Sequence, residues 1–368
     1  MRGGWLRPHL VAALIGAVLT LDAVALVVTP STTQVATADT VAITTTTTTS
    51  TTTTTLPSTT TTEPPTTTEP PPTAPPPTAP PTAPPTEPPT TVAQAVIAPA
   101  PTGAFTYAPY QGLGTWADVY DWSAAYGGSA FGLADIDRAA SLGVQTLFLQ
   151  TGRADNAQPV LEEGTVRALI ARAHADGMRV VGWFLPYLDD PQADLAHLLA
   201  AAQLPVDGLA VDIESRSVAD VADRNARLVN LSAALRAALP GEVLSAIVLP
   251  PVIMEDVNPN YWPGFPWADI APYYDVWQPM DYWSFRTGYW RSAYNYTAVD
   301  VDRVRSHIGN PTAPVHPIGG VADTTTVDDV AGMMQAAAER GCIGGSLYDY
   351  RTTGDELWPA VQAFRALG

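Results

Sequence analysis

The sequence predicts one α/β domain with the architecture of a (β/α)8 TIM barrel, preceded by a signal or anchor segment and a disordered Thr/Pro-rich linker. Three observations support this prediction. Low-complexity composition confines the folded part to residues 104–368, about 265 residues, which is the typical size of one such barrel. In that part, eight short apolar runs alternate with stretches of helical periodicity. The pattern G-x-G-x-x-G, which would favour an open doubly wound sheet, follows none of these runs.

Residues 1–38 have the pattern of an export signal. Arg2, Arg7 and His9 precede an apolar stretch over residues 10–28, as in a signal peptide. The sequence Ala-Thr-Ala at 36–38 offers a cleavage site. The alternative is an uncleaved signal anchor, because about 19 apolar residues can just span a bilayer. In both cases we expect the rest of the chain to be secreted or tethered, through residues 10–28, at the extracellular face of the membrane.

Residues 39–103 are predicted to be a disordered linker. Between positions 44 and 91, 24 of 48 residues are Thr and 15 are Pro, which leaves too few apolar side chains for a core. Proline favours an extended backbone, so we expect a semi-rigid spacer that holds the domain of residues 104–368 away from a surface.

The charge balance excludes several classes of protein. The chain has 36 acidic and 18 basic residues, a formal net charge of −18, and every base is Arg. Nucleic-acid binding needs basic residues to neutralise phosphates, so no nucleic-acid partner is expected.

The single Cys342 excludes an internal disulfide framework and a thiolate zinc site. We expect no cofactor and no metal, and a monomeric domain.

Each predicted unit of the barrel is an apolar run followed by a helix. The apolar runs lie at 112–122, 144–150, 179–185, 208–213, 243–249, 276–280, 315–318 and 343–348. The helices are expected at 135–142, 162–176, 193–204, 218–239, 267–273, 299–308, 327–340 and 355–366. In the second helix, Val166, Leu169, Ile170 and Ala173 recur at i, i+3, i+4 and i+7, which gives one apolar face. Gly177 follows it directly, as helix-terminating glycines do.

The ends of the predicted strands carry polar and aromatic residues. In a TIM barrel the active site lies where the strands run into the following loops. Aromatic faces stack on the C–H surfaces of sugars, and carboxylates bind hydroxyls and transfer protons, so this mixture predicts a carbohydrate ligand. The residues expected to bind it are Asp118, Trp122, Gln150, Arg153, Trp183, Tyr187, Gln278, Tyr282, Trp283, His316, Tyr348 and Asp349.

Two carboxylates at the end of the fourth strand are the main catalytic candidates. Side chains alternate along a strand, so Asp212 and Glu214 share the face opposite the apolar residues and point into the barrel, about 7 Å apart along the strand. Two close carboxylates repel, which raises one pKa and keeps a proton available near neutral pH. A structural role, such as binding Arg153, is the alternative.

The fourth and sixth strands resemble known motifs. The sequence Asp-Gly-Leu-Ala-Val-Asp-Ile-Glu at 207–214 resembles the D-G-x-D-x-D-x-E signature of the chitinase family of glycoside hydrolases, and Met-Asp-Tyr at 280–282 is similar to its M-x-Y-D. The resemblance implies that Glu214 is the proton donor, Asp212 its partner and Tyr282 a ligand of the sugar. Ala210 and Trp283 stand where that family has Asp. The chain also resembles barrel lysozymes with Asp-x-Glu on strand four and Asp on strand one, here Asp118, and, taken together, an actinobacterial glycoside-hydrolase-like barrel.

A second carboxylate is needed opposite Glu214 if the ordinary two-carboxylate mechanism operates. Asp281, Asp118 and Asp349 are the candidates, and Asp281 is expected to be catalytic together with Glu214 and Asp212. Strict alternation argues against Asp281, because it turns this side chain outward if Gln278 and Tyr282 face inward.

The sequence therefore predicts a secreted or surface-tethered glycoside hydrolase that acts on an extracellular or cell-wall polysaccharide by carboxylate acid/base catalysis. The alternative is a catalytically inactive carbohydrate-binding barrel, which the losses at Ala210 and Trp283 favour.

Overall fold

The computed structural model describes residues 105–368, which lie in one unit of the chain, Ile97–Gly368. The predicted signal segment (1–38) and the predicted linker (39–103) lie outside the described residues. Within residues 105–368, no helix is long and apolar enough to cross a membrane.

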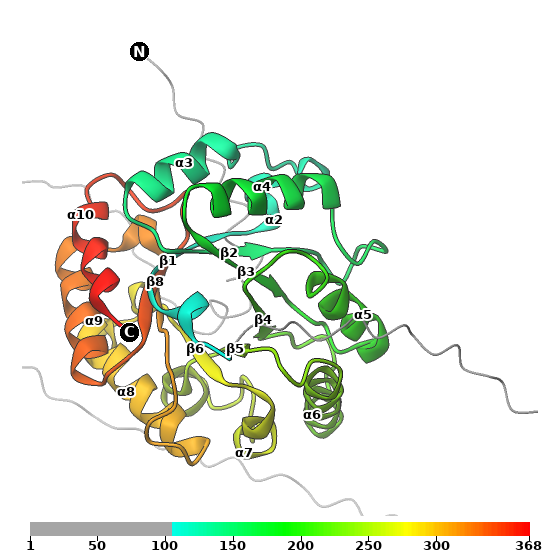
Figure 1. Ribbon diagram of the computed structural model, residues 1–368. Coiled ribbons are helices and arrows are strands. Elements are labelled where there is room, and N and C mark those ends of the chain that lie inside the picture. The colour runs from blue at the N-terminus through cyan, green and yellow to red at the C-terminus, as the bar shows by residue number, and fades with distance from the viewer. Residues whose placement is uncertain (1–104) are drawn as a thin grey trace, which may run out of the picture. The chain divides into compact units, whose positions relative to one another are not determined.

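Eight parallel strands form a closed barrel in which each strand pairs with the next along the chain and β8 pairs with β1 (Figure 1). This confirms the predicted (β/α)8 TIM barrel. The strands are β1 (Gly112–Ala117), β2 (Thr146–Gln150), β3 (Arg179–Phe184), β4 (Gly208–Ile213), β5 (Leu244–Val248), β6 (Val276–Asp281), β7 (Ile318–Gly320) and β8 (Gly344–Tyr348).

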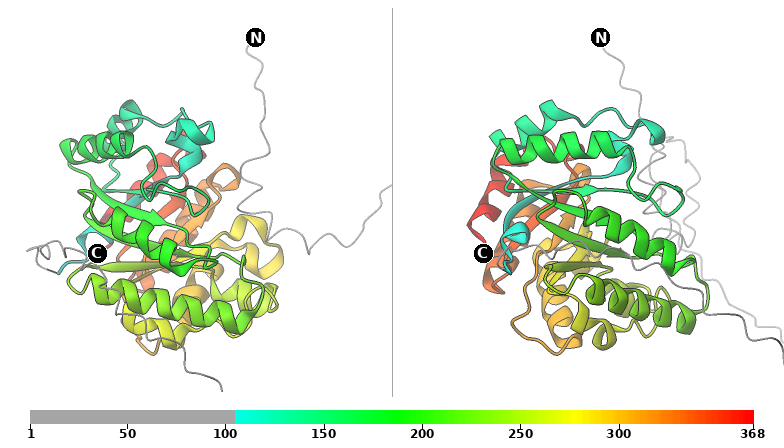
Figure 2. Two further views of the ribbon diagram at one scale, coloured as in Figure 1. Left: turned by 90° about the vertical axis from the view of Figure 1, so that its right-hand side faces the viewer. Right: turned by 45° about the vertical axis from the view of Figure 1, so that its right-hand side comes forward.

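Helices cover the outside of the strands, as the views in Figures 1 and 2 show. They are α2 (Val119–Trp122), α3 (Leu133–Ser141), α4 (Glu163–Ala175), α5 (Pro191–Ala201), α6 (Val221–Ala238), α7 (Trp267–Ile270), α8 (Ala293–His307), α9 (Val327–Glu339) and α10 (Trp358–Val361). The apolar face predicted for α4 is buried at the four positions named above.

The boundaries differ from the prediction where a side chain caps a helix or a proline interrupts a strand. The apolar run predicted over 112–122 ends as a strand at Ala117, because Asp118 accepts a hydrogen bond from Tyr120 N and starts α2. Strand β7 begins only after Pro317, which has no N–H to donate to the neighbouring strand. Helix α8 starts earlier than the expected residue 299, because Ser292 caps it.

The register of the sheet determines which side chains fill the barrel. Residues at the same level of neighbouring parallel strands face the same side. Asp212 of β4 is level with Ile247 of β5, which is level with Gln278 of β6, so Asp212 and Gln278 face the same side of the sheet. On β1 and β2, the paired rings of Trp116 and Phe148 stack with centroids 4.3 Å apart. Each buried ring of this kind contributes about 1.5–3 kcal/mol to the free energy of unfolding.

A hydrogen-bonded chain of polar groups crosses the same core. Trp116 Nε1 donates to Ser346 Oγ at 2.8 Å, and Ser346 Oγ lies 3.0 Å from His316 Nε2. His316 Nδ1 lies 2.8 Å from the carbonyl oxygen of Tyr110, which can only accept. His316 is therefore a neutral ring with its proton on Nδ1, and the Ser346 hydroxyl donates to Nε2.

Candidate active site

Two carboxylates lie at the end of β4, among the loops that follow the C-terminal ends of the strands; we call this end the barrel mouth. Asp212 is the second-last residue of β4, and Glu214 follows its last residue, Ile213. Asp212 is buried and Glu214 is half-buried. Alternation along the strand gives both the same direction, as the sequence predicts.

Burial raises the pKa of both carboxylates, because their charged forms lose hydration. The pKa of Glu214 rises to about 7. The pKa of Asp212 rises well above its ordinary value, first through burial and then through the negative charge of Glu214. The pair therefore retains a proton near neutral pH, which a general acid requires.

Two tyrosines at the mouth connect this pair with a second group of acids. Tyr282 follows β6, and the negative charges of Glu214 and Asp212 add to burial in raising its pKa. Its ring centroid lies 6.1 Å from that of Tyr348, the last residue of β8. The Tyr348 hydroxyl donates a 2.7 Å hydrogen bond to Asp118 Oδ2. Tyr282 and Tyr348 are both half-buried, so a ligand can reach them.

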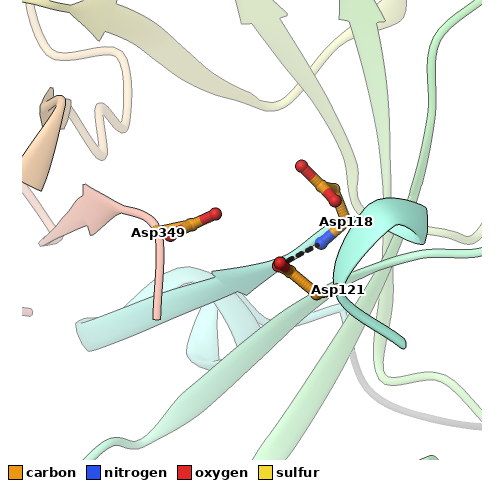
Figure 3. Close-up of side chains that lie close together, drawn as sticks. All are labelled: Asp118, Asp121 and Asp349. Atoms are coloured by element: carbon orange, nitrogen blue, oxygen red, sulfur yellow. Dashed lines mark hydrogen bonds between the residues drawn. The ribbon is translucent and has the colours of Figure 1, made fainter. Parts of the chain in front are cut away.

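The second acidic group consists of Asp118, Asp121 and Asp349 (Figure 3). One oxygen of each carboxylate lies within 4.8 Å of the others. Burial raises the pKa of all three, to about 8 for Asp121 and about 6 for Asp349. Asp121 therefore holds a proton more strongly than Asp349.

This acidic cluster is partnered by the chain itself. Asp118 Oδ1 accepts from Tyr120 N at 2.8 Å, and Asp121 Oδ1 accepts from Arg351 Nη1 at 2.9 Å. Asp349 Oδ1 accepts from the backbone N–H and the hydroxyl of Thr352. Three carboxylates at this spacing could ligate a hard cation. The hydrogen bonds and the Arg351 charge stabilise the three carboxylates without a cation. The spacing of the cluster is therefore not evidence of a metal site.

Arg153 joins the loops that follow β1, β2 and β3. Its Nε and Nη2 donate to the two carboxylate oxygens of Asp155 at 2.8 and 2.6 Å, and its Nη2 donates to Tyr187 Oη at 3.3 Å. Its guanidinium carbon lies 5.2 Å from the ring centroid of Tyr120 and 4.9 Å from that of Tyr126. This network explains why Arg153 does not pair with Asp212 or Glu214, the structural role considered for them above.

Asp281 does not belong to the group of carboxylates at the mouth. It lies level with Gly319, one residue beyond Met280, and is fully buried. Its neighbours are Thr297 and Asp300 of α8, so its side chain lies on the outer face of β6. Side chains alternate along β6 up to this residue, so Asp281 points away from the mouth, and the expectation that it is catalytic is wrong.

Two of the predicted ligand-binding residues also lie elsewhere. His316 precedes β7 and is fully buried. Its ring is hydrogen-bonded to the backbone oxygen of Tyr110, at the opposite end of the barrel from the mouth. Trp283 is fully buried, and its indole fills the space beside Gly319 of β7, where Met333 of α9 also packs. Neither side chain can meet a ligand at the mouth.

Four other predicted residues support the site from within the protein. They are the buried residues Trp122, Gln150, Trp183 and Gln278. Gln150 Oε1 accepts from Val119 N at 3.0 Å, and Gln278 Oε1 accepts from Ser245 Oγ at 2.6 Å. The predicted residues that are half-buried at the mouth are Arg153, Tyr187, Glu214, Tyr282 and Tyr348.

Sequence reasoning missed Asp121, Arg216 and Tyr261. Asp121 is the N3 residue of the capping box that begins with Asp118, a pattern that reads as a helix start. Tyr261 lies in the Pro- and Trp-rich segment after β5 and comes close enough to Glu214 for the charge of that carboxylate to raise its pKa. The aromatic composition of this segment was the available signal, but it did not identify which ring approaches Glu214.

Comparisons with known proteins agree with this fold. The sequence matches no protein-family model and no curated protein. Among solved structures, active domain 2 of a chitinase from Pyrococcus furiosus has a TM-score of 0.51 and 15% identity, covering 70% of this chain and 94% of that one. A class V chitinase from Pseudomonas fluorescens Pf-5 has a TM-score of 0.50 and 10% identity, covering 69% and 99%. The spore cortex-lytic enzyme SleL of Bacillus cereus has a TM-score of 0.50 and 8% identity, covering 70% and 75%.

At these identities the likeness shows the fold alone. The chain shares the eight-stranded barrel fold with these three proteins. Its chemistry must be argued from the residues at the mouth.

Proposed function

We propose that this chain is a glycoside hydrolase with Glu214 as its proton donor. The observation that carries the proposal is the position of Glu214, half-buried at the end of β4, with a pKa raised to about 7. A carboxylic acid with such a pKa can protonate a glycosidic oxygen at neutral pH. The fold shared with two chitinases and a spore cortex-lytic enzyme supports this assignment.

Asp118 is the carboxylate that we propose as the partner of Glu214. It continues the inward-facing positions of β1, in which Trp116 precedes it by two residues, and it accepts hydrogen bonds from Tyr348 and from Tyr120 N. These donors stabilise its charged form. Ionised Asp118 would act as nucleophile or as base toward water, depending on its distance from Glu214 across the bound sugar.

The substrate that we propose is an extracellular or cell-wall polysaccharide. The basic and apolar start of the sequence supports export, and the half-buried Tyr187, Tyr282 and Tyr348 supply rings for sugar faces. The loss of an inner acid at Ala210 argues against the complete substrate-assisted machinery that the chitinase signature would provide.

The proposal is tested by measuring release of reducing ends from a panel of soluble and cell-wall glycans. The full chain should hydrolyse at least one glycan, and the matched isosteric variant Glu214→Gln should not. Binding must be measured on the same panel, because it separates the two functions that fit a carbohydrate site.

A carbohydrate-binding barrel without activity is the second candidate. The observations that favour it are Ala210 on β4 and the enclosure of Asp281 and Trp283 away from the mouth. It predicts glycan binding without turnover, and equal binding by Glu214→Gln and the native chain.

A further inference from the structure

Tyr261 and Trp262, two consecutive aromatic residues between β5 and α7, each contact the guanidinium of an arginine that follows β4 in the sequence. The guanidinium carbon of Arg216 lies 4.5 Å from the ring centroid of Tyr261, and that of Arg224 lies 4.1 Å from Trp262. Trp262 Nε1 also donates to Asn225 Oδ1 at 2.7 Å, which ties this segment to α6. The segment is therefore anchored, and Tyr261 is buried within it.

Arg216 is an exposed cation only two residues beyond Glu214. The ion pairs within residues 105–368 involve other arginines, such as Arg153, Arg227 and Arg351. A guanidinium on a long flexible stem can reach a carboxylate two residues away, and such a pair lowers the pKa of the carboxyl group by about 1–3 pH units. The pKa of Glu214 is raised by burial and is not held down by the Arg216 charge.

Tyr261 is close to both groups. After burial, the negative charge of Glu214 raises the pKa of the Tyr261 phenol, and the positive charge of Arg216 lowers it. The other titratable groups that face Glu214 are Asp212 on β4 and Tyr282 after β6. Neither of these is a cation. The other cation near Tyr261 is Arg224, which is buried with its guanidinium over the Trp262 ring. Arg216 is therefore the cation whose position decides whether Glu214 has an ion-pair partner.

We propose that Tyr261 is a positioning residue that holds the Arg216 guanidinium on its ring face and so keeps this cation from pairing with Glu214. The ring face offers the guanidinium a favourable site away from the carboxylate. The consequence for the reaction rests on the proposed function, because an unpaired Glu214 keeps the proton that the glycosidic oxygen receives.

The test is a direct titration of Glu214 in the full-length protein by NMR, with ¹³C-labelled glutamate side chains and Glu214→Gln to assign the signal. Tyr261→Leu removes the ring face and releases Arg216, so the pKa of Glu214 should fall by about 1–3 pH units. Tyr261→Phe keeps the ring face and should leave this pKa where it is. In Tyr261→Leu/Arg216→Gln the cavity remains but the cation is absent, and the pKa should return to the native value.

Arg216→Gln alone is the matched control at an exposed position. It should leave the pKa of Glu214 unchanged, because the native guanidinium does not act on this carboxylate. A rise in the pKa of Glu214 in this variant would overturn the proposal even if Tyr261→Leu failed to fold. A folded Tyr261→Leu protein with an unchanged pKa, or a double variant in which the pKa stays low, would overturn it as well.

The titration separates this inference from the proposed function. Where turnover is found, the alkaline limb of the kcat/KM profile should move to lower pH in Tyr261→Leu and return in the double variant. Where no glycan is hydrolysed but the NMR shifts follow the expected order, glycoside hydrolysis fails and the positioning role of Tyr261 stands. Where a glycan is hydrolysed but the NMR shifts do not follow the expected order, the proposed function stands and the positioning role of Tyr261 fails.

Discussion

Tyr348 donates a hydrogen bond of 2.7 Å to Asp118 across the seam where β8 pairs with β1. Burial raises the pKa of Asp118, and this hydrogen bond is the largest of the effects that oppose the rise. The ring of Tyr348 also lies 6.1 Å from that of Tyr282, whose pKa responds to Glu214. The tyrosine pair therefore links the two groups of carboxylates at the barrel mouth, and the hydrogen bond from Tyr348 favours the ionised form of Asp118.

Tyr348→Phe should raise the pKa of Asp118, because it removes this hydrogen bond and keeps the ring. We expect the acidic limb of the kcat/KM profile to move to higher pH. At pH 5, kcat/KM should fall about 10- to 100-fold, which corresponds to about 1.5–3 kcal/mol for a hydrogen bond to a charged group. The measurement is kcat/KM against pH for both proteins. An unshifted acidic limb would show that Asp118 is not the ionised partner of Glu214.

Glu214→Gln should fold normally and lose turnover by several orders of magnitude, because the amide cannot protonate the glycosidic oxygen. The loss should be largest for substrates with poor leaving groups and small for activated aryl glycosides, which need no protonation. The measurement is the steady-state rate of the native protein and of Glu214→Gln on both kinds of substrate, with circular dichroism to check the fold. Near-normal rates on a natural glycan would remove Glu214 from the role of proton donor.

Asp212→Asn should leave the alkaline limb of kcat where it is. The negative charge of Glu214 adds to burial in raising the pKa of Asp212, so Asp212 still holds its proton while Glu214 ionises. The substitution therefore replaces a neutral carboxyl group with a neutral amide, and kcat measured against pH shows whether the limb moves. If Asp212→Asn abolished activity at every pH while Glu214→Gln kept it, the roles of the two residues would be exchanged.

The barrel and the placement of Asp212 and Glu214 could be predicted because they depend on local patterns. The eight alternations of apolar run and helix determine the strand order, and alternation along β4 determines the direction of Asp212 and Glu214. Errors arose at strand ends. Val315 forms only an isolated bridge with Trp277, so His316 lies before β7 and not at its end.

The missed residues depend on contacts between distant segments. Tyr261 lies 47 positions from Glu214 in the sequence, and its ring becomes relevant only once the β5–α7 segment is anchored through Trp262 and Asn225. The cluster of Asp118, Asp121 and Asp349 likewise forms only when β8 closes on β1. Local sequence patterns carry no information about these approaches.

Asp281→Asn should leave activity intact and make the protein more stable at alkaline pH. Burial raises the pKa of Asp281 from 3.8 to about 8, so between these values the folded chain keeps a proton that the unfolded chain releases. The free energy of unfolding of the native protein therefore falls as the pH rises through this range. The side-chain amide that this substitution introduces carries no charge and can donate to Asp300 at every pH.

We expect Asp281→Asn to exceed the native free energy of unfolding by about 1–3 kcal/mol at pH 8, the usual cost of a buried group without a partner. The gain should disappear near pH 4. Urea denaturation at both values measures it. Loss of glycan hydrolysis in a folded Asp281→Asn protein would restore Asp281 as a catalytic residue.

His316 should make the barrel sensitive to acid. Burial lowers the pKa of this ring from 6.5 to about 4, and the hydrogen bond to Tyr110 O only partly opposes the change. Between these pH values the unfolded chain binds a proton that the folded chain does not. The free energy of unfolding therefore decreases as the pH falls from about 6.5 to about 4, by about 3 kcal/mol at about 1.4 kcal/mol per pH unit.

His316→Gln removes this titration. The variant should be less stable than the native protein at pH 7.5. The Ser346 hydroxyl, which accepts from Trp116 Nε1, loses the ring nitrogen Nε2 of His316 as its acceptor. Its free energy of unfolding should nevertheless decline less between pH 7.5 and pH 4.5 than that of the native protein. Urea denaturation at the two pH values gives both slopes, and the difference between them isolates His316 from the carboxylates that titrate in the same range. Equal slopes would mean that the ring accepts a proton inside the folded barrel.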